Sequence, residues 1–458
     1  MTEESWHEAR LIPTSGINGA EEQERRATSA LLAVMTAVKE FGRSLTKPLG
    51  APAGAVETYI EVPFQLGEQR LYPDGLIRVS RGQRSWTALV EVKTSNNELQ
   101  AQQLENYLDI ARENGFDAVI TISNEIAPMA GQHPTKVDKR KLRKVALHHL
   151  PWTKVLTEAV MQQEFRGVAD PDQAWILGEL IRYLEHPRSG AMEFEDMGES
   201  WVSVRDSVQA GTLRAGDKGV SEVVSRFDAL LRFVSLRMGR QLGAEVTPVM
   251  TRRELEDPSI RQSALIEGLV ANGSLTGEMR IPDTIGTLVI TADLRARTLT
   301  CHVDVDAPRE GRPKTRVNWV LRQLKKAPDR VRLEAFTARS RSGAAELLSV
   351  AREHPELLLP DPAKEPRTFR IALSAPMGIK RGRGRGCFID SMIDLVDTFY
   401  AEVMQDLHAW SAAPPRMRTE PVPDAEPAVA SDLSSTSLSS QDGPEHIVPE
   451  QVAAATSR

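Results

Sequence analysis

Apolar residues in the first third of the chain change from helical spacing to strand spacing. At the start they recur every three or four positions, at Leu31, Val34, Met35, Val38 and Leu45. This spacing predicts one helix from about Glu21 to Ser44 with a single buried stripe. Shorter β-rich runs follow at 56–62, 75–79 and 86–90, and each run predicts a strand.

A second helix and a buried strand are expected after these three strands. Ser95 and Glu98 have the spacing of a capping box, which predicts that a helix starts there and ends near Gly115. Its inward positions would be Leu104, Tyr107, Leu108 and Ala111. The apolar run at 118–122 then predicts a fully buried strand. The predicted order is therefore helix, three strands, helix and strand.

Charged residues stand at the ends of the two later strands of this group. Asp74 directly precedes the run at 75–79, and Glu91 and Lys93 follow the run at 86–90. Because side chains alternate along a strand, Glu91 and Lys93 share one face and Val92 points into the opposite layer. Two carboxylates can hold a hard divalent cation, and a nearby ammonium can orient the attacking water or help to deprotonate it. The arrangement predicts phosphodiester cleavage; the alternative is a solvated charge pair beside a turn that Asp74 caps.

The ordered combination of these segments resembles the PD-(D/E)xK nuclease superfamily, whose members share a restriction-endonuclease-like αβββαβ core. Pro73-Asp74 matches the first half of the family motif, and Glu91-Val92-Lys93 matches the second half. Gln103 and Tyr107 are similar to the Gln-x-x-x-Tyr motif of the RecB-type branch. The match spans roughly residues 20–150 and implies an α/β fold for that part of the chain.

The resemblance also implies a set of metal ligands. Asp74 and Glu91 would hold the ion, with the Val92 carbonyl as a further ligand. Glu24 would be the acid that many members carry on the first helix, although the neighbouring acids at 21 and 22 compete for this role. The expected cofactor is Mg²⁺ or Mn²⁺.

The implied activity is that of a metal-dependent deoxyribonuclease acting in defence or repair. The predicted catalytic residues are Asp74, Glu91, Lys93, Gln103 and Tyr107. Among them, Lys93 would orient the water, whereas Gln103 and Tyr107 would steady the site or the substrate. The alternative function is a non-catalytic nucleic-acid-binding protein that keeps the nuclease fold. A third alternative is a structural or partner-binding protein with an ordinary surface charge network.

Composition is compatible with this interpretation and excludes several others. The 458 residues are 41% apolar and 26% charged, which is ordinary for a globular protein, and the net charge is −6. The polar start of the chain and the absence of a long apolar run predict a cytoplasmic protein with no membrane partner. With only Cys301 and Cys387, the chain cannot build a disulfide framework or a zinc cluster from cysteines.

Positive charge is concentrated in patches that suggest contacts with DNA. The predicted nucleic-acid-binding residues are Lys139, Arg140, Lys141, Arg143, Lys144, Arg381, Arg383 and Arg385. The first group could neutralise phosphates near the metal site or form a solvated loop. The second belongs to an Arg-Gly loop that could meet phosphates, or could pair with local acids such as Asp390 and Asp394. A third basic patch surrounds a short helical pattern near 317–324, for which an ordinary surface helix is favoured.

The rest of the chain predicts an α+β region and a disordered tail. A strand at 145–150 and a helix at 154–165 would complete a first domain at 1–168. The elements expected after it are helices from 173, at 220–240, near 317, at 344–352 and at 388–408, and strands at 274–281, 286–294, 298–305, 331–336 and 368–373. They define a region at 169–410 whose role is unassigned. A protein partner could bind through this region, and the chain could also form a homodimer. The Pro- and Ser-rich segment at 411–458 is expected to be disordered.

Histidines and aspartates elsewhere could compete as metal ligands. His302, Asp304 and Asp306 alternate along one expected strand and therefore share a face. Ligands spaced along one strand seldom converge on one ion, so a wet polar sheet face is the favoured interpretation. His148 and His149 would point to opposite faces of their strand, which favours structural roles for both.

Overall fold

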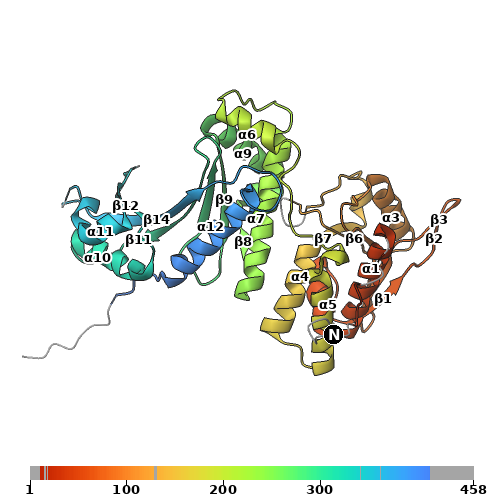
Figure 1. Cartoon of the computed structure of the whole chain (residues 1–458). Helices are drawn as coiled ribbons and strands as arrows, with labels where there is room; N and C mark the ends of the chain where they lie inside the picture. The colour runs from red at the N-terminus through yellow and green to blue at the C-terminus, as the bar shows by residue number, and fades with distance from the viewer. Residues whose placement is uncertain are drawn as a thin grey trace, which may run out of the picture. The chain divides into compact units, whose positions relative to one another are not determined.

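The N-terminal part of the chain forms a five-stranded sheet whose central strands are buried on both faces (Figure 1). A computed structural model describes residues 11–14, 17, 19–127, 132–340, 342–361 and 363–412. In spatial order the strands are β1 (Ala55–Ile60), β4 (Gly75–Arg81), β5 (Arg84–Val92), β6 (Ala118–Ser123) and β7 (Ala146–Pro151). Strand β4 runs antiparallel to both β1 and β5, whereas β5, β6 and β7 run parallel, so the sheet is mixed.

Helices cover both faces of this sheet. One face packs against α1 (Ala20–Ala37), α2 (Lys39–Thr46), α4 (Trp152–Val160) and α5 (Pro171–Glu185). The other face packs against α3 (Ala101–Glu113) and the small hairpin of β2 (Phe64–Leu66) and β3 (Gln69–Leu71). Val90 and Val92 point into the first core and Leu89 into the second, so the predicted alternation along β5 is confirmed.

The first predicted helix is broken in the structure. Helix α1 ends at Ala37, Val38 is extended with φ −104° and ψ 92°, and α2 begins at Lys39. The break turns α2 so that Phe41 and Leu45 enter the same core as the stripe of α1. Gly42 makes the tight corner possible, because a Cβ at this position would lie 2.3 Å from the carbonyl oxygen of Met35.

The predicted capping box before α3 is wrong. Ser95 adopts φ 53°, and its hydroxyl donates a hydrogen bond to Gln23 Oε1 at 2.6 Å. Its side chain is therefore engaged with α1, and α3 begins only at Ala101. The predicted end of the helix is confirmed, since α3 stops at Glu113 and Gly115 has φ 69°.

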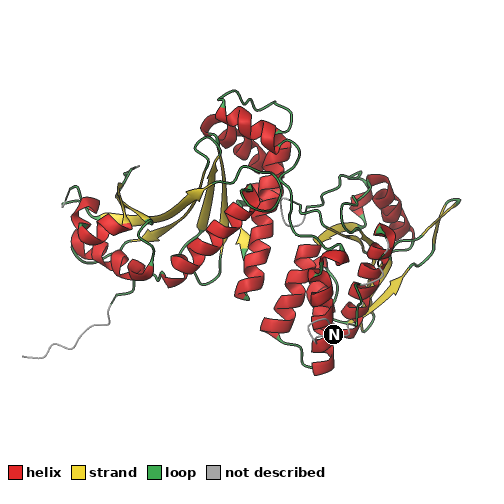
Figure 2. Cartoon of the chain, viewed as in Figure 1, coloured by secondary structure: helices red, strands yellow, loops and turns green. Residues whose placement is uncertain are grey.

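The second part of the chain forms a seven-stranded antiparallel sheet packed with helices (Figure 2). In spatial order its strands are β13 (Ala344–Leu347), β12 (Arg332–Thr337), β14 (Pro366–Pro376), β11 (Thr298–Asp306), β10 (Leu288–Asp293), β9 (Ser274–Arg280) and β8 (Thr247–Pro248). The helices are α6 (Trp201–Gln209), α7 (Val220–Leu242), α8 (Arg252–Glu256), α9 (Pro258–Asn272), α10 (Pro313–Gln323), α11 (Leu348–Glu353) and α12 (Phe388–Glu402). One continuous apolar core joins α7, α9, α10 and α12 to the sheet.

Most expected elements of this region are present, with two corrections. Residues 344–347, expected as the start of a helix, form strand β13 beside β12, and α11 starts only at Leu348. The last helix ends at Glu402 and is followed by a 3-10 turn at Met404–Asp406, rather than continuing to His408.

The core of the first sheet continues beyond the domain end expected at residue 168. Leu177, Leu180 and Leu184 of α5 belong to the same buried cluster as the stripe of α1. The described residues up to Ser411 form one compact unit. Apart from Ser411 and Ala412, the expected tail lies outside the described residues. Among the described helices, none has the length and apolar character needed to cross a membrane.

The corner between α1 and α2 gives a test of the packing. Gly42→Ala is expected to lower the free energy of unfolding by about 1–3 kcal/mol, because the added methyl group overlaps the Met35 carbonyl. This loss should exceed the roughly 1 kcal/mol that alanine gains over glycine in a helix. Urea unfolding measures it. Gly216→Ala, where the new methyl group meets no atom within 4 Å, is the matched control, and equal stability of the two variants would contradict the packing described.

Candidate active site

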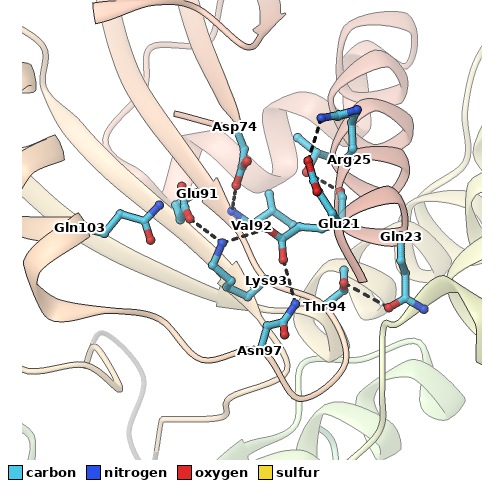
Figure 3. A network of polar contacts seen from close by, with 12 residues as sticks. Glu21, Gln23, Arg25, Asp74, Glu91, Val92, Lys93, Thr94, Asn97 and Gln103 are labelled. Atoms are coloured by element: carbon cyan, nitrogen blue, oxygen red, sulfur yellow. Dashed lines mark hydrogen bonds and ion pairs between the residues drawn. The ribbon is translucent and has the colours of Figure 1, made fainter. Parts of the chain in front are cut away.

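Asp74, Glu91 and Lys93 meet at one end of the β4–β5 pair (Figure 3). Gly75 pairs with Val90 in the register, so the next residues outward, Asp74 and Glu91, face each other across the two strands. Asp74 Oδ2 accepts a hydrogen bond from the Val92 N–H at 2.7 Å. The Lys93 ammonium nitrogen lies 2.7 Å from Glu91 Oε1. The structure therefore brings the three predicted charged groups together.

Glu24 joins this cluster from α1. Its Oε1 accepts a hydrogen bond from Lys93 Nζ at 2.9 Å, and its Oε2 accepts one from Asn97 Nδ2 at 3.3 Å. The two neighbouring acids of α1 are engaged elsewhere, since Glu21 pairs with Arg25 and Glu22 with Arg26 in the next turn. Glu24 is thus the residue of this group that contacts Lys93.

Gln103 and Tyr107 approach the cluster from α3. Gln103 Nε2 donates to the Tyr107 hydroxyl at 3.1 Å, and that hydroxyl donates to the carbonyl of Tyr72 at 3.4 Å. Figure 3 shows the Gln103 amide beside Glu91. Burial, followed by the charge of Glu91, raises the pKa of Tyr107, so its hydroxyl stays protonated. The pair fixes the main chain two residues before Asp74.

Glu91 is the most deeply buried acid of the cluster. Its side chain is 1% exposed, and its Oε1 forms an ion pair with the Lys93 ammonium at 2.7 Å. Neither oxygen has another hydrogen-bond partner among the described residues. Burial raises the pKa of Glu91 to about 8, and nearby Asp74 adds to this effect while Lys93 opposes it. Burial also raises the pKa of Asp74. Both acids therefore hold a proton more tightly than exposed carboxyl groups do.

Lys93 carries the opposite charge into the same space. Burial lowers its pKa, but Glu91 and Glu24 raise it by more, so that the pKa of Lys93 lies above its ordinary value. The side chain is consequently an ammonium at neutral pH. It can orient a water molecule or a phosphate oxygen by donating hydrogen bonds, but it cannot accept a proton.

A cleft of about 400 Å³ opens beside Asp74. Its lining residues are Glu21, Glu24, Arg25, Thr28, Ile60, Glu61, Tyr72, Pro73 and Asp74. Arg25 is paired with Glu21 at 3.2 Å and with Glu61 at 3.1 Å, so its charge is balanced locally. The cleft is therefore acidic and offers carboxylate oxygens, which hard divalent cations prefer.

The carboxylate oxygens of this cluster are the type of ligand that a divalent cation prefers, although the side chains do not surround a common point where an ion would sit. Among the described residues, no three His, Cys, Asp or Glu side chains converge as a ready metal site. Lys93 forms ion pairs with both Glu24 and Glu91 and so neutralises the acids that a metal would use. The buried oxygens of Glu91, which have no hydrogen-bond partner other than Lys93 among the described residues, have the property expected of a ligand whose partner is an ion. Asp74 and Glu91 are the residues that could hold it.

The loop after Lys93 contains contacts that sequence reasoning missed. Gln23 Oε1 accepts hydrogen bonds from the hydroxyls of Thr94 and Ser95, and its amide donates to the Arg188 carbonyl at 2.8 Å. The Ser95 N–H donates to the Gly190 carbonyl at 2.9 Å. The polar run Thr-Ser-Asn-Asn directly after the Lys93 motif is the sequence signal for this loop, although the spacing of Ser95 and Glu98 predicts a helix cap there.

Two histidines and a threonine form a hydrogen-bonded group on the strands next to Glu91. Thr121 pairs with Glu91 in the parallel register, and its hydroxyl lies 2.8 Å from both His149 Nδ1 and His133 Nε2. His149 Nε2 donates to the Glu125 carbonyl at 2.7 Å, so His149 Nδ1 accepts from Thr121. Burial lowers the pKa of His149 to about 3 and also lowers that of His133. Both imidazoles are neutral members of a hydrogen-bonded chain, as the structural interpretation of His149 requires.

The other proposed metal ligands do not converge. On β11, Asp304 forms a two-bond ion pair with Arg370 at 2.7 and 2.8 Å, whereas Cys301 and Val303 are buried on the opposite face. This arrangement agrees with a wet polar sheet face. Burial lowers the pKa of His148, which does not share the hydrogen-bonded chain of His149.

The first predicted basic patch is partly neutralised. Arg140 pairs with Asp138 at 2.7 Å, and Lys141 pairs with Asp109 of α3. Lys139, Arg143 and Lys144 are exposed. Positions two apart on a helix point about 200° apart, so Asp109 and the attached segment lie on a different side of α3 from Tyr107.

The Arg-Gly loop pairs with local acids. Arg381 lies 3.3 Å from Asp196, and Arg383 lies 3.0 Å from Glu193 and 2.6 Å from Asp390. Arg385 is exposed. Two of the three arginines, Arg381 and Arg383, therefore pair with acids, as the alternative of a connector paired with local acids expects. Asp390 is the expected partner, whereas Glu193 and Asp196 are partners that the sequence does not predict.

The basic helix α10 also departs from expectation at one position. Arg316, one of the basic residues around the helical pattern near 317–324, is only 3% exposed and donates to the carbonyls of Gly311, Pro366 and Arg309. It holds the start of the helix rather than facing solvent.

Neither a scan against models of protein families nor a search among curated proteins found a match. The functional argument therefore rests on the residues themselves.

The hydrogen bond from Val92 to Asp74 predicts different stabilities for two Asp74 variants. Asp74→Asn keeps an oxygen that can accept from the Val92 N–H, whereas Asp74→Ala leaves this amide without its acceptor. Asp74→Ala should therefore be less stable than Asp74→Asn by about 1–3 kcal/mol in denaturant unfolding. If the two unfold at the same denaturant concentration, the bond contributes nothing, and the local geometry described above is wrong.

The neutral state of His149 predicts a pH dependence of stability. Its pKa is lower in the folded protein than the 6.5 expected for the unfolded chain, so its contribution is complete above pH 6.5 and is lost as the pH falls below it. His149→Gln should reduce the slope of unfolding free energy against pH, between about pH 5 and 6.5, by roughly 1 kcal/mol per pH unit. Denaturant titrations at several pH values measure the slope. The exposed His408→Gln variant is the control, and a parental slope in His149→Gln would contradict the prediction.

Proposed function

We propose that the first sheet carries the active site of a metal-dependent nuclease that hydrolyses DNA phosphodiester bonds. The order α1, β1, β4, β5, α3, β6 and the mixed sheet support a restriction-endonuclease-like αβββαβ core. The observation that carries the proposal is the convergence, beside an open cleft, of Glu24, Asp74, Glu91, Lys93, Gln103 and Tyr107.

Asp74 and Glu91 would hold Mg²⁺ or Mn²⁺ through their carboxylate oxygens. When bound, the ion would polarise the scissile phosphate and stabilise the departing oxygen. Glu91 is suited to this role because it is buried and its oxygens have no hydrogen-bond partner other than Lys93 among the described residues. Asp74 is held toward the site by the Val92 N–H, so its position does not depend on the ion.

Lys93 would align the attacking water as a hydrogen-bond donor. Its charge is secured by Glu24 and Glu91, and Asn97 fixes the second oxygen of Glu24. Gln103 and Tyr107 position the substrate-side main chain through the carbonyl of Tyr72. Each side chain thus has a task that follows from its contacts.

The distribution of charge favours catalysis over simple binding of nucleic acid. A binding module that relies on phosphate contacts presents lysine and arginine to the backbone. The cleft here is lined by Glu21, Glu24, Glu61 and Asp74, and its arginine is paired with two of these acids. A polyanion can approach such a surface only when cations occupy it, which is the situation of a metal-dependent hydrolase.

A cleavage assay tests the proposal. Purified protein should cut linear, circular or single-stranded DNA in the presence of Mg²⁺ or Mn²⁺, and EDTA should stop the reaction. Asp74→Asn and Glu91→Gln should each lower the rate by more than about 100-fold, because each removes a carboxylate that would hold the ion on which stabilisation of the transition state depends. Gel electrophoresis of labelled DNA measures the fragments.

Asp306→Asn provides the matched control, because it removes an exposed strand carboxylate outside the cleft. It should cut at the parental rate. Parental cleavage by Asp74→Asn and Glu91→Gln would refute the proposed site. Metal-independent retardation of DNA without fragments would instead support the non-catalytic binding protein.

A further inference from the structure

Two large apolar side chains are exposed in the otherwise acidic cleft. Tyr72 is 52% exposed and Ile60 is 48% exposed, and both line the cleft that contains Asp74. The remaining wall is mainly carboxylate. A single exposed apolar side chain is common on protein surfaces, but two in one acidic cleft beside a candidate metal ligand offer a contact for a ligand with an apolar face.

The tyrosine is held in place from several sides. Its carbonyl accepts the hydrogen bond from Tyr107, and Pro73 restricts its backbone to extended conformations. The Arg70 guanidinium lies over its ring, 5.3 Å from the centroid. A ring fixed in this way loses little conformational freedom when a flat ligand stacks on it.

We infer that Tyr72 is a stacking platform for an unpaired base, and that the substrate at this site is a single strand or a frayed end. The inference rests on the proposed nuclease function and names its substrate class. Inside a duplex both faces of each base are covered by neighbouring base pairs, so only an unpaired base can stack on the ring. Ile60 offers an apolar contact in the same cleft, and Arg70 backs one face of the ring and leaves the opposite face for the base.

The charges of the cleft support this choice over an intact duplex. Duplex binding depends on cationic side chains that follow both phosphate backbones. Among the described residues that line the cleft, Arg25 is the one basic side chain, and two acids already neutralise it. Stacking gives affinity that does not require phosphate neutralisation, and it places the adjoining phosphate at the acids.

A binding experiment tests stacking separately from cleavage. Fluorescence anisotropy would be measured in Ca²⁺ for a labelled oligothymidine strand, for the same strand in a duplex, and for a strand of equal length built of abasic units. The parent protein should bind the oligothymidine strand more tightly than both others. Tyr72→Ala should weaken binding of that strand by about 5- to 150-fold and leave the abasic strand unchanged, since stacking on one aromatic ring contributes this much per base.

Tyr59→Ala is the matched control. Tyr59 is also an exposed tyrosine, 43% exposed with Arg78 over its ring at 5.8 Å, but it does not line the cleft. The Tyr59→Ala variant should bind all three probes as tightly as the parent protein does. Tyr72→Phe should still bind the oligothymidine strand more tightly than the abasic strand. Parental binding by Tyr72→Ala, equal affinity of the parent for all probes, or no binding at all would overturn the inference. Base-dependent binding by a protein that never cleaves would retain the platform and reject only the nuclease.

Discussion

The placement of a buried carboxylate beside a buried ammonium is the constraint on which the site depends. Glu91 is carried into the interior by β5, and Lys93 follows on the same face with its head group between Glu91 and Glu24. Neither group would remain ionised alone in such surroundings, because removing an unpaired charge from water costs several kcal/mol. The pair also connects the sheet to α1, so the geometry of the acids and the packing of the first helix are determined together.

Local rules were enough to predict the strands and the motif, because both depend on alternation. The positions of Asp74, Glu91 and Val92 follow from a period of two along neighbouring strands, and the pairing of β4 with β5 follows from their short connection. The end of α3 at Gly115 was predictable for a similar reason, since glycine allows the left-handed backbone found there.

Long-range contacts decided the features that the sequence could not reveal. The residues around Ser95 predict a helix cap, but its hydroxyl donates a hydrogen bond to Gln23, which is 72 positions away in the sequence. The break at Val38 is set by the packing of α2 against a sheet that forms later in the chain. Arg383 is paired with Glu193, and no local pattern relates two residues so far apart. The roles of the convergent residues are still a prediction, because the fold positions them without demonstrating their chemistry.

The attachment of the loop after Lys93 has a mechanical consequence. The Gly190 carbonyl accepts hydrogen bonds from the Ser95 N–H and from Asn124, and a Cβ at Gly190 would lie 2.8 Å from Thr94. The chain leaves the first sheet for the second through this segment, so the loop after Lys93 is hydrogen-bonded to the start of that connector. A displacement of Gly190 would therefore break these hydrogen bonds and act on the loop that directly follows Lys93.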